Sequence, residues 1–344
     1  MRYNPLGNTG LYVSQLCLGA MTFGGTGFWE VVGKLGQKEV ERLVGTALDA
    51  GVNFVDTANV YSEGQSESLL GEALAALGRP RDQVVVATKV RGRMGPGPNQ
   101  VGLSRAHILA AIDASLKRLR LEYVDLYQIH GFDPATPIEQ TVRALDDVVR
   151  SGKSRYVGFS NLSAWHAMKA IAFAQHNGLA RFESAQVYYS LAGRDIEREM
   201  VPMAQDQRVA ILPWSPLAGG LLSGKFDPDK PGGPEGARRS TFDFPPVDRA
   251  RLSRVLGALR SVSEATGQSV ARLALAWLLT RPFVTSVIIG AKTHEQLVDN
   301  LAATDAKLTP EHIKALDEAS TLPREYPGWM LEFQNREQRG AVSR

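Results

Sequence analysis

Short runs of apolar, often β-branched residues alternate with longer amphipathic stretches along almost the whole chain. Eight runs have the length and composition of strands: residues 15–19, 53–56, 83–89, 123–130, 155–160, 182–187, 209–214 and 284–290. Between them, the stretches 38–50, 105–119 and 137–152 repeat apolar residues at the spacing of a helix with one buried face. Within the strand runs apolar residues follow one another directly, which is typical of parallel strands covered by helices on both faces.

Eight strand–helix units in 344 residues predict a closed (β/α)8 barrel, the TIM-barrel fold of the α/β class, as a single domain over residues 1–344. An open doubly wound sheet is the alternative, but such sheets usually contain fewer strands and a change in composition at a linker, which this sequence lacks. Residues 1–15 precede the first strand and predict a β-hairpin, with Gly7 and Asn8 in its turn, that closes the bottom of the barrel.

Three segments depart from the repeat, and long irregular segments in compact domains are usually functional. Residues 23–37 form a glycine-rich, aromatic loop after the first strand, and residues 215–248 form a longer loop after the seventh strand. The C-terminal tail, residues 320–344, carries several large apolar side chains without helical periodicity. We expect this tail to fold back over the mouth of the barrel, beside the long βα loops of that face.

The composition is that of an ordinary soluble protein, with 44% hydrophobic and 22% charged residues and a formal net charge of +3. Acidic and basic residues are interspersed, which argues against nucleic acid or an anionic membrane as a partner. Cys17 is the only cysteine, so an internal disulfide is excluded and a reducing compartment fits. The N-terminus lacks the apolar segment of a secretion signal, and the longest apolar run, residues 273–279, is too short to cross a bilayer. We therefore expect a cytoplasmic protein, as a monomer or weak homo-oligomer.

Four residues that can exchange protons stand near the ends of predicted strands. Asp56, Lys89 and His130 end the second, third and fourth strands, and Tyr61 follows Asp56 in the next loop. Each alone could be structural, as a helix cap, a lysine with a buried stem or a core histidine, but active sites of (β/α)8 barrels lie where the strands end. Together they predict general acid catalysis on a carbonyl: Lys89 favours the phenolate of Tyr61, Asp56 holds Lys89, and His130 orients the carbonyl oxygen. Because no side chain can donate a hydride, this chemistry requires a cofactor.

Between Gly19 and Asn300 the sequence closely resembles the aldo-keto reductase superfamily, particularly its bacterial NADPH-dependent members. The segments that carry the resemblance are residues 53–74, 84–90, 123–134, 152–161, 214–225 and 288–300, in that order. The resemblance implies reversible reduction of an aldehyde or ketone to the alcohol, with Tyr61 as acid and base, tuned by Asp56 and Lys89. It also implies NADP(H) bound across the barrel mouth, without a Rossmann domain.

The resemblance and the side-chain chemistry together predict the cofactor site. Amide and hydroxyl groups of Ser160, Asn161 and Gln186 would bind the nicotinamide carboxamide, and the Trp214 ring would stack on the nicotinamide. The glycine-rich loop with Lys225 would approach the pyrophosphate, and Lys292 would bind a 2′-phosphate at the start of a helix. Many relatives have an arginine at the position of Gln296, so the preference for NADP over NAD depends here on Lys292. The full predicted set is Gly19, Met21, Thr22, Asp56, Ser160, Asn161, Gln186, Trp214, Ser215, Pro216, Leu217, Gly219, Lys225, Gly290, Lys292, Thr293, Gln296 and Asn300.

Aromatic residues in the loops predict an apolar substrate pocket. The predicted pocket residues are Phe23, Phe28, Trp29, Tyr61, His130, Phe132 and Trp329. Phe132 occupies a place where some relatives have a tryptophan, so this pocket wall differs from theirs. A bulky, weakly polar substrate such as a xenobiotic, terpenoid or mycotoxin ketone is expected.

Other classes of protein fit the sequence less well. The six histidines include no His-x-His or His-x-x-x-His pair, so no metal site is expected. The segments GGTGFW and GRMGPG do not match the Gly-x-Gly-x-x-Gly motif of a Rossmann dehydrogenase. An alternative that stays open is an NADP-binding regulatory subunit on the same scaffold, with little turnover of its own.

Overall fold

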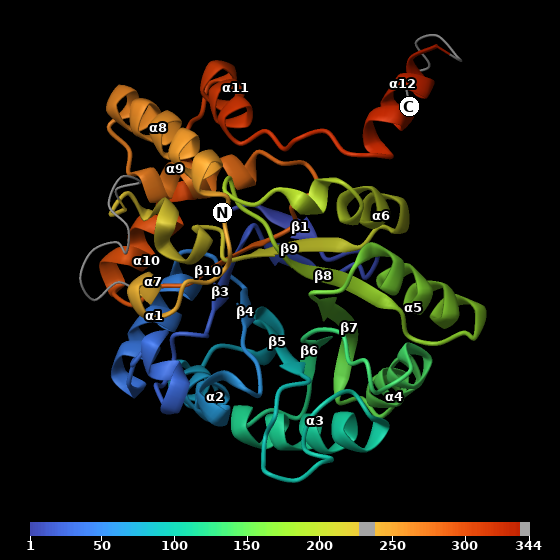
Figure 1. Cartoon of the computed structure of the whole chain (residues 1–344). Coiled ribbons are helices and arrows are strands. Elements are labelled where there is room, and N and C mark those ends of the chain that lie inside the picture. The colour runs from blue at the N-terminus through green and yellow to red at the C-terminus, as the bar shows by residue number, and fades with distance from the viewer. Residues whose placement is uncertain (227–237, 338–344) are drawn as a thin grey trace.

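The computed structural model describes residues 1–226 and 238–337, and in them eight parallel strands form a barrel surrounded by helices (Figure 1). The strands are β3 (Leu16–Gly19), β4 (Phe54–Asp56), β5 (Val85–Val90), β6 (Val124–Ile129), β7 (Ser154–Ser160), β8 (Phe182–Tyr188), β9 (Ala210–Trp214) and β10 (Val287–Ile289). They are hydrogen-bonded in the order β10-β3-β4-β5-β6-β7-β8-β9, and a parallel bridge between Ile211 and Val284 joins the two ends of the sheet. Each strand overlaps a predicted run, and the (β/α)8 fold is confirmed.

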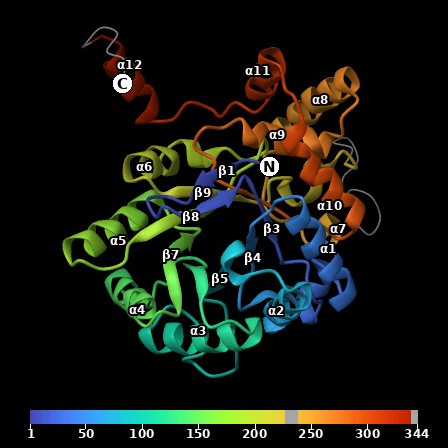
Figure 2. The same ribbon diagram turned by 180° about the vertical axis from the view of Figure 1, so that it is seen from behind.

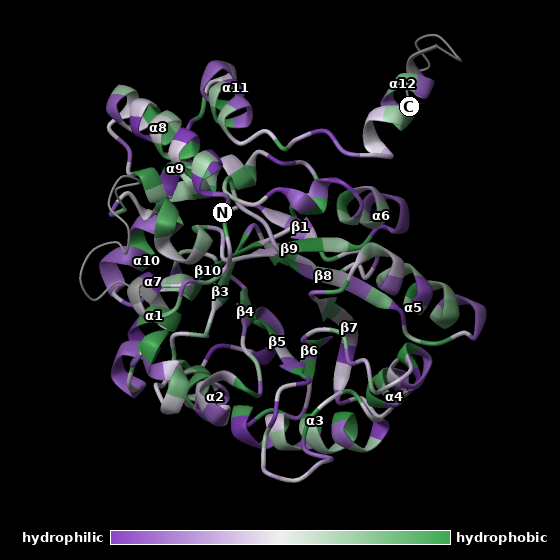
Figure 3. Cartoon of the chain, in the orientation of Figure 1, coloured by the Kyte–Doolittle hydropathy of each residue, from purple (hydrophilic) through white to green (hydrophobic). Residues whose placement is uncertain are grey.

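Amphipathic helices cover the outside of the barrel (Figure 2). They are α1 (Gln37–Asp49), α2 (Gln65–Leu77), α3 (Arg105–Leu119), α4 (Ile138–Arg150), α5 (Ala164–His176), α6 (Met200–Gln207), α8 (Arg249–Thr266), α9 (Val270–Leu279), α10 (His294–Leu301) and α11 (Pro310–Ala319). In α4, Ile138, Val142, Leu145 and Val148 recur at helical spacing and all four are buried. Hydrophobic and hydrophilic residues accordingly alternate along the helices in Figure 3. None of the described helices has the length and apolar composition needed to cross a bilayer.

The N-terminal residues form the predicted hairpin at the bottom of the barrel. Strands β1 (Tyr3–Pro5) and β2 (Tyr12–Ser14) pair antiparallel. Leu6 and Val13 have no exposed surface, and they pack in one apolar cluster with residues from the first half of the barrel strands. The mouth at the carboxyl ends of the strands is therefore left as the open end.

The two long loops at this mouth contain short helices. The loop after β3 includes η1 (Gly27–Val31), and the loop after β9 includes η5 (Ala218–Ser223) and α7 (Arg238–Thr241). Residues 227–237 of the predicted loop 215–248 lie outside the described residues.

The prediction for the C-terminal tail is wrong in two respects. Residues Gly328–Glu337 form helix α12, because Pro327 precedes a run of good helix formers and its carbonyl accepts the N–H groups of Met330 and Leu331. Figures 1 and 2 show α12 at the end of an extended segment, away from the barrel mouth. Residues 338–344 of the predicted tail lie outside the described residues.

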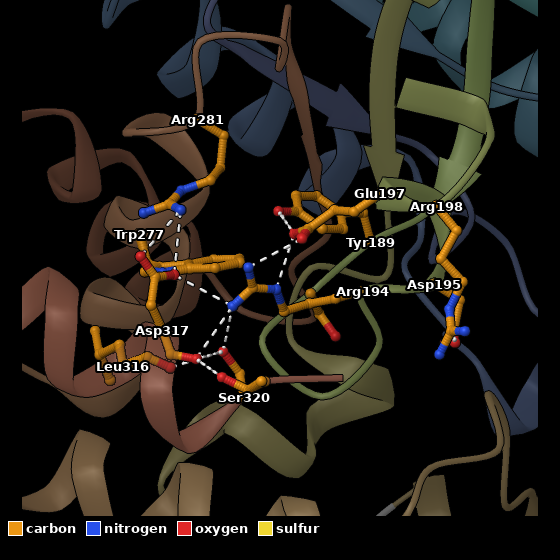
Figure 4. Close-up of polar contacts among 12 residues, drawn as sticks. Tyr189, Arg194, Asp195, Glu197, Arg198, Trp277, Arg281, Leu316, Asp317 and Ser320 are labelled. Atoms are coloured by element: carbon orange, nitrogen blue, oxygen red, sulfur yellow. Dashed lines mark hydrogen bonds and ion pairs between the residues drawn. The ribbon is translucent and has the colours of Figure 1, made fainter. Parts of the chain in front are cut away.

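A network of charged and aromatic side chains fixes α11 to the barrel (Figure 4). Arg194, in the loop after β8, pairs with Glu197 and with Asp317 of α11. Asp317 also accepts hydrogen bonds from Arg281 at 3.1 Å and from the indole of Trp277 in α9 at 3.0 Å. This network connects the loop after β8 to helices α9 and α11.

Candidate active site

The four residues predicted for catalysis lie together at the barrel mouth. Asp56 ends β4, Lys89 is near the end of β5, and His130 directly follows β6. The Lys89 Nζ atom donates hydrogen bonds to Asp56 Oδ2 at 2.5 Å, to the Thr57 carbonyl at 2.8 Å and to the Tyr61 hydroxyl oxygen at 3.3 Å. The Tyr61 ring lies edge-on to His130, with 5.6 Å between ring centroids. Neighbouring parallel strands thus bring together residues that are far apart in the sequence.

An unusual turn aims Tyr61 at this cluster. The three residues after Tyr61 have left-handed backbone conformations, with φ of 48° at Ser62, 57° at Glu63 and 94° at Gly64. A side chain at Gly64 would be strained by this φ, and its Cβ atom would lie 2.8 Å from Cδ of Arg118. The Ser62 hydroxyl donates to the Phe23 carbonyl at 3.1 Å, which holds the turn against the first loop.

Asp56 is held by more partners than expected. Its Oδ1 atom accepts hydrogen bonds from the side-chain amides of Gln128 at 3.0 Å and Gln186 at 2.9 Å. Sequence reasoning missed Gln128, although a glutamine within a predicted buried strand was a usable signal. The amide nitrogen of Gln186 is thus engaged by Asp56, which limits what this side chain can offer to a nicotinamide.

A cavity of about 800 Å³ opens above the catalytic cluster, within the usual range for a small-molecule site. Its lining includes every residue predicted to bind the cofactor except Thr293. The Thr293 hydroxyl instead caps α10 by accepting the backbone N–H of Gln296. The cap orients the start of this helix, so its contribution to a phosphate site would be indirect.

The predicted carboxamide-binding residues form one hydrogen-bonded group. Asn161 donates to the His130 carbonyl at 3.2 Å and to the Ser160 hydroxyl at 2.8 Å, and its Oδ1 accepts the Trp214 indole N–H at 3.0 Å. These bonds fix the edge of the Trp214 ring beside the catalytic cluster. A flat ring in this position fits the stacking role that the sequence predicts.

Positive charge and exposed backbone at the other end of the cavity fit a dinucleotide. Lys225 and Lys292 both line the cavity. Ser215 and Ala218 have φ near 50°, in the kind of turn whose N–H groups can surround an anion. The Gln296 side chain accepts the backbone N–H of Lys292 at 2.8 Å, and Lys292 Nζ donates to the Val31 carbonyl of η1 at 3.4 Å. The residues present therefore suit a long, anionic cofactor.

Residues 15–321 of the chain match the aldo/keto reductase family. The chain belongs to this family. Versiconal hemiacetal acetate reductase of Aspergillus parasiticus is 37% identical over 95% of this chain and 99% of its own length. The uncharacterized oxidoreductase YrpG of Bacillus subtilis is 38% identical over 92% of this chain and 95% of its own length. A probable voltage-gated potassium channel subunit beta of Oryza sativa is 38% identical over 92% of this chain and 96% of its own length.

Burial and charge set the protonation states in this aldo/keto reductase. Burial lowers the pKa of Lys89, but Asp56 and Tyr61 outweigh burial, so the pKa of Lys89 lies above its usual value. Burial raises the pKa of Tyr61 more than the Lys89 cation lowers it, so the net shift is upward and Tyr61 is a neutral phenol at pH 7. The prediction that Lys89 favours the phenolate therefore describes one contribution and not the net result. Burial, with repulsion from Lys89 and Arg91, lowers the pKa of His130 to about 3, and its imidazole is neutral.

The structure corrects three predicted pocket residues. Phe23 is 1% exposed and packs in the hydrophobic core, because the first loop turns inward at this point. Phe132 packs on the ring of His166, with 4.1 Å between centroids, and does not line the cavity. Trp329 lies in α12 and its ring contacts Tyr326, away from the cavity.

Two aromatic residues that sequence reasoning missed, Phe242 and Phe244, line the cavity together with the predicted Phe28 and Trp29. Phe28 of η1 contacts Phe242 of the loop after β9, with 5.1 Å between ring centroids. Phe244 stacks between Phe242 and Trp214, with centroid distances of 5.4 and 5.7 Å. Trp29 continues the same row toward Tyr61 at 5.2 Å. The signal was available, since Phe242 and Phe244 belong to a loop already expected to be functional.

Proposed function

We propose that this aldo/keto reductase is an enzyme that uses NADPH to reduce an aldehyde or ketone reversibly to the alcohol. The observation that carries the proposal is the buried Lys89 ammonium, which hydrogen-bonds both Asp56 and Tyr61 below a cavity that His130 also lines. A bound nicotinamide supplies the hydride for such a reaction. The residues that would hold the cofactor are the cavity-lining residues predicted from the sequence, with Lys292 favouring the 2′-phosphate of NADP(H).

The catalytic side chains then have distinct tasks. The neutral imidazole of His130 donates a hydrogen bond to the carbonyl oxygen and orients it, and the Tyr61 phenol transfers a proton to the same oxygen as it gains charge. Lys89 stabilises the phenolate that remains, and Asp56 keeps the charge of Lys89 compensated in a buried position. Such general acid catalysis typically contributes roughly 10² to 10⁴ in rate.

The aromatic row that crosses the mouth favours a flat or bulky, largely apolar substrate, such as a xenobiotic, terpenoid or mycotoxin ketone. The name of the relative versiconal hemiacetal acetate reductase supports reduction of an organic carbonyl-derived compound. The proposed partner is this small-molecule substrate, and the proposal gives nucleic acid and membrane no role. The protein would act in the cytoplasm as a monomer or weak homo-oligomer.

A second candidate is an NADP-binding subunit with little turnover. Three relatives named as probable or supposed voltage-gated potassium channel beta subunits, at 37 to 38% identity, favour this candidate. The two candidates differ in whether the Tyr61 cluster supports turnover at a useful rate.

Loss of NADPH absorbance, measured across aldehydes, quinones, alicyclic ketones and terpenoid or mycotoxin ketones, tests the proposal. Tyr61→Phe should lower kcat by at least about 10²-fold while the fold and NADPH binding persist. A Tyr61→Phe variant as active as the wild type would refute the assigned mechanism. Tight NADPH binding by a wild type that reduces no carbonyl would favour the subunit.

A further inference from the structure

Arg91 places a cation at the cavity that the catalytic scheme does not use. It follows β5, two residues after Lys89, and lines the cavity together with Val60, Gly92 and His130. Its Nε atom donates to the Phe132 carbonyl at 2.7 Å, which fixes the plane of the guanidinium. Within the described residues, the two terminal nitrogens of Arg91 have no hydrogen-bond partner. A planar pair of donors is therefore held at the cavity wall.

Among the described residues, no carboxylate forms an ion pair with Arg91. Asp133 accepts hydrogen bonds from the backbone N–H groups of Leu103 at 2.7 Å and Ala135 at 3.0 Å, and from the Thr136 hydroxyl at 2.8 Å. These bonds engage both carboxylate oxygens. Burial raises the pKa of Asp133, but the hydrogen bonds and the nearby charge of Arg91 outweigh burial and lower it, so Asp133 interacts with Arg91 at a distance without an ion pair. The carboxylate of Asp56 is engaged by Lys89. The positive charge of Arg91 also contributes to the low pKa of His130.

Arg91 lies far around the barrel from the residues that suit the cofactor phosphates. It follows β5, whereas Lys225 follows β9 and Lys292 follows β10. In the strand order of the closed sheet, β5 is three strands from β10 and four from β9. The cation thus belongs to the part of the cavity beside Tyr61 and His130, where a substrate would be reduced.

We propose that Arg91 binds a carboxylate of the substrate, so that the preferred substrates are flat aldehydes or ketones that carry one carboxylate on an otherwise apolar body. This inference rests on the proposed reductase function. A guanidinium suits the task because its paired N–H groups match the two oxygens of a carboxylate. The carboxylate does not react: the carbonyl gains a hydride from the cofactor and a proton from Tyr61, and Arg91 contributes to binding and orientation.

A matched pair of substrates tests this proposal: para-carboxybenzaldehyde and its neutral methyl ester. The wild type should reduce the acid with a kcat/KM about tenfold higher than the ester, and added salt should reduce this preference because Arg91 is exposed. Arg91→Met should abolish the preference mainly by raising KM for the acid, and Arg91→Lys should retain part of it. Arg93→Met is the control, because Arg93 donates to the Gly95 and Gly97 carbonyls and does not line the cavity.

Two outcomes would overturn the inference. One is a wild type without preference for the acid, and the other is an Arg91→Met variant that loses both substrates equally, as a purely structural role would predict. Calorimetric titration of the NADP⁺-loaded protein with benzoate keeps the test independent of turnover. Benzoate should bind the wild type and the Arg93→Met variant about tenfold more tightly than Arg91→Met. If the wild type reduces neither aldehyde but shows this benzoate difference, the reductase proposal fails while the anion site stands.

Discussion

The Lys89 Nζ atom and the Tyr61 hydroxyl oxygen lie 3.3 Å apart, and both side chains are almost completely buried, at 0% and 7% exposure. An ammonium in such a position is stable because Asp56 compensates its charge at 2.5 Å. In the proposed reaction the same pair would provide a proton donor and a cation that stabilises the donor after the proton has left. Structure and the proposed catalysis therefore depend on the same buried contact.

Lys89→Met should lower both activity and stability. It leaves the Asp56 carboxylate buried without a cation, which should cost about 3–5 kcal/mol of unfolding free energy, and it removes the charge that stabilises the phenolate. Urea unfolding and kcat measure the two effects. The double variant Asp56→Asn with Lys89→Met should recover much of the stability and none of the activity; recovery of both would show that the cation has no catalytic role.

The neutral state of His130 predicts a pH dependence of stability. Its pKa is about 3 in the folded protein and near 6.5 in the unfolded chain. As the pH falls below 6.5, the histidine becomes protonated in the unfolded chain but stays neutral in the folded protein. The free energy of unfolding therefore decreases between pH 6.5 and about pH 3, by on the order of a few kcal/mol. His130→Gln should show a shallower loss than the wild type between pH 6.5 and 4. Parallel stability curves for the two proteins would contradict this assignment.

Lys292→Ala should weaken NADPH more than NADH, by about 1 kcal/mol, because Lys292 is exposed and its contact with a 2′-phosphate would be partly screened. Fluorescence titration, with Trp214 as the reporter, measures both cofactors. Lys225→Ala is the matched control, since it should weaken both cofactors alike if Lys225 faces the pyrophosphate. If Lys292→Ala weakened NADPH and NADH equally, Lys292 would not bind the 2′-phosphate.

Truncation after Pro323 should leave reduction and cofactor binding within about twofold of the wild type, because helix α12, the described part of the removed segment, lies away from the mouth. Exposed side chains such as Tyr326 at 74% and Phe333 at 61% make few contacts that truncation could remove. The kcat/KM for a bulky and a small carbonyl checks this. A lower kcat/KM for the bulky substrate alone would show that the tail contributes to the substrate site.

Asp317→Ala should destabilise the fold by about 2–3 kcal/mol, because it removes the acceptor shared by Arg194, Arg281 and the buried indole of Trp277. Asp195→Ala is the control within Figure 4: its pair with Arg198 spans 3.6 Å and its side chain is 69% exposed. The control should change stability by less than about 0.5 kcal/mol. Chemical unfolding compares the two, and equal effects would show that the Asp317 network is not a stabilising one.

The sequence by itself determined the barrel and the meeting of Asp56, Tyr61, Lys89 and His130 at its mouth. The order of strand and helix patterns predicts parallel strands, and their carboxyl ends must meet at one mouth. Asp56, Lys89 and His130 stand at or near strand ends, so local position in the sequence was sufficient to bring them together. Most residues proposed to hold the cofactor line the cavity for the same reason, since they end strands or begin the following loops.

Only the tertiary structure decided which loop residues face the cavity. Phe23 and Phe28 belong to one loop and have the same side chain, yet Phe23 is buried in the core and Phe28 lines the cavity. Gln128 holds Asp56 across 72 residues of sequence, and Phe242 meets Phe28 from the other side of the mouth. Periodicity describes the contacts of a regular helix or strand with its own core. The direction of a loop side chain, or of a tail such as α12, depends on which distant segment packs against it.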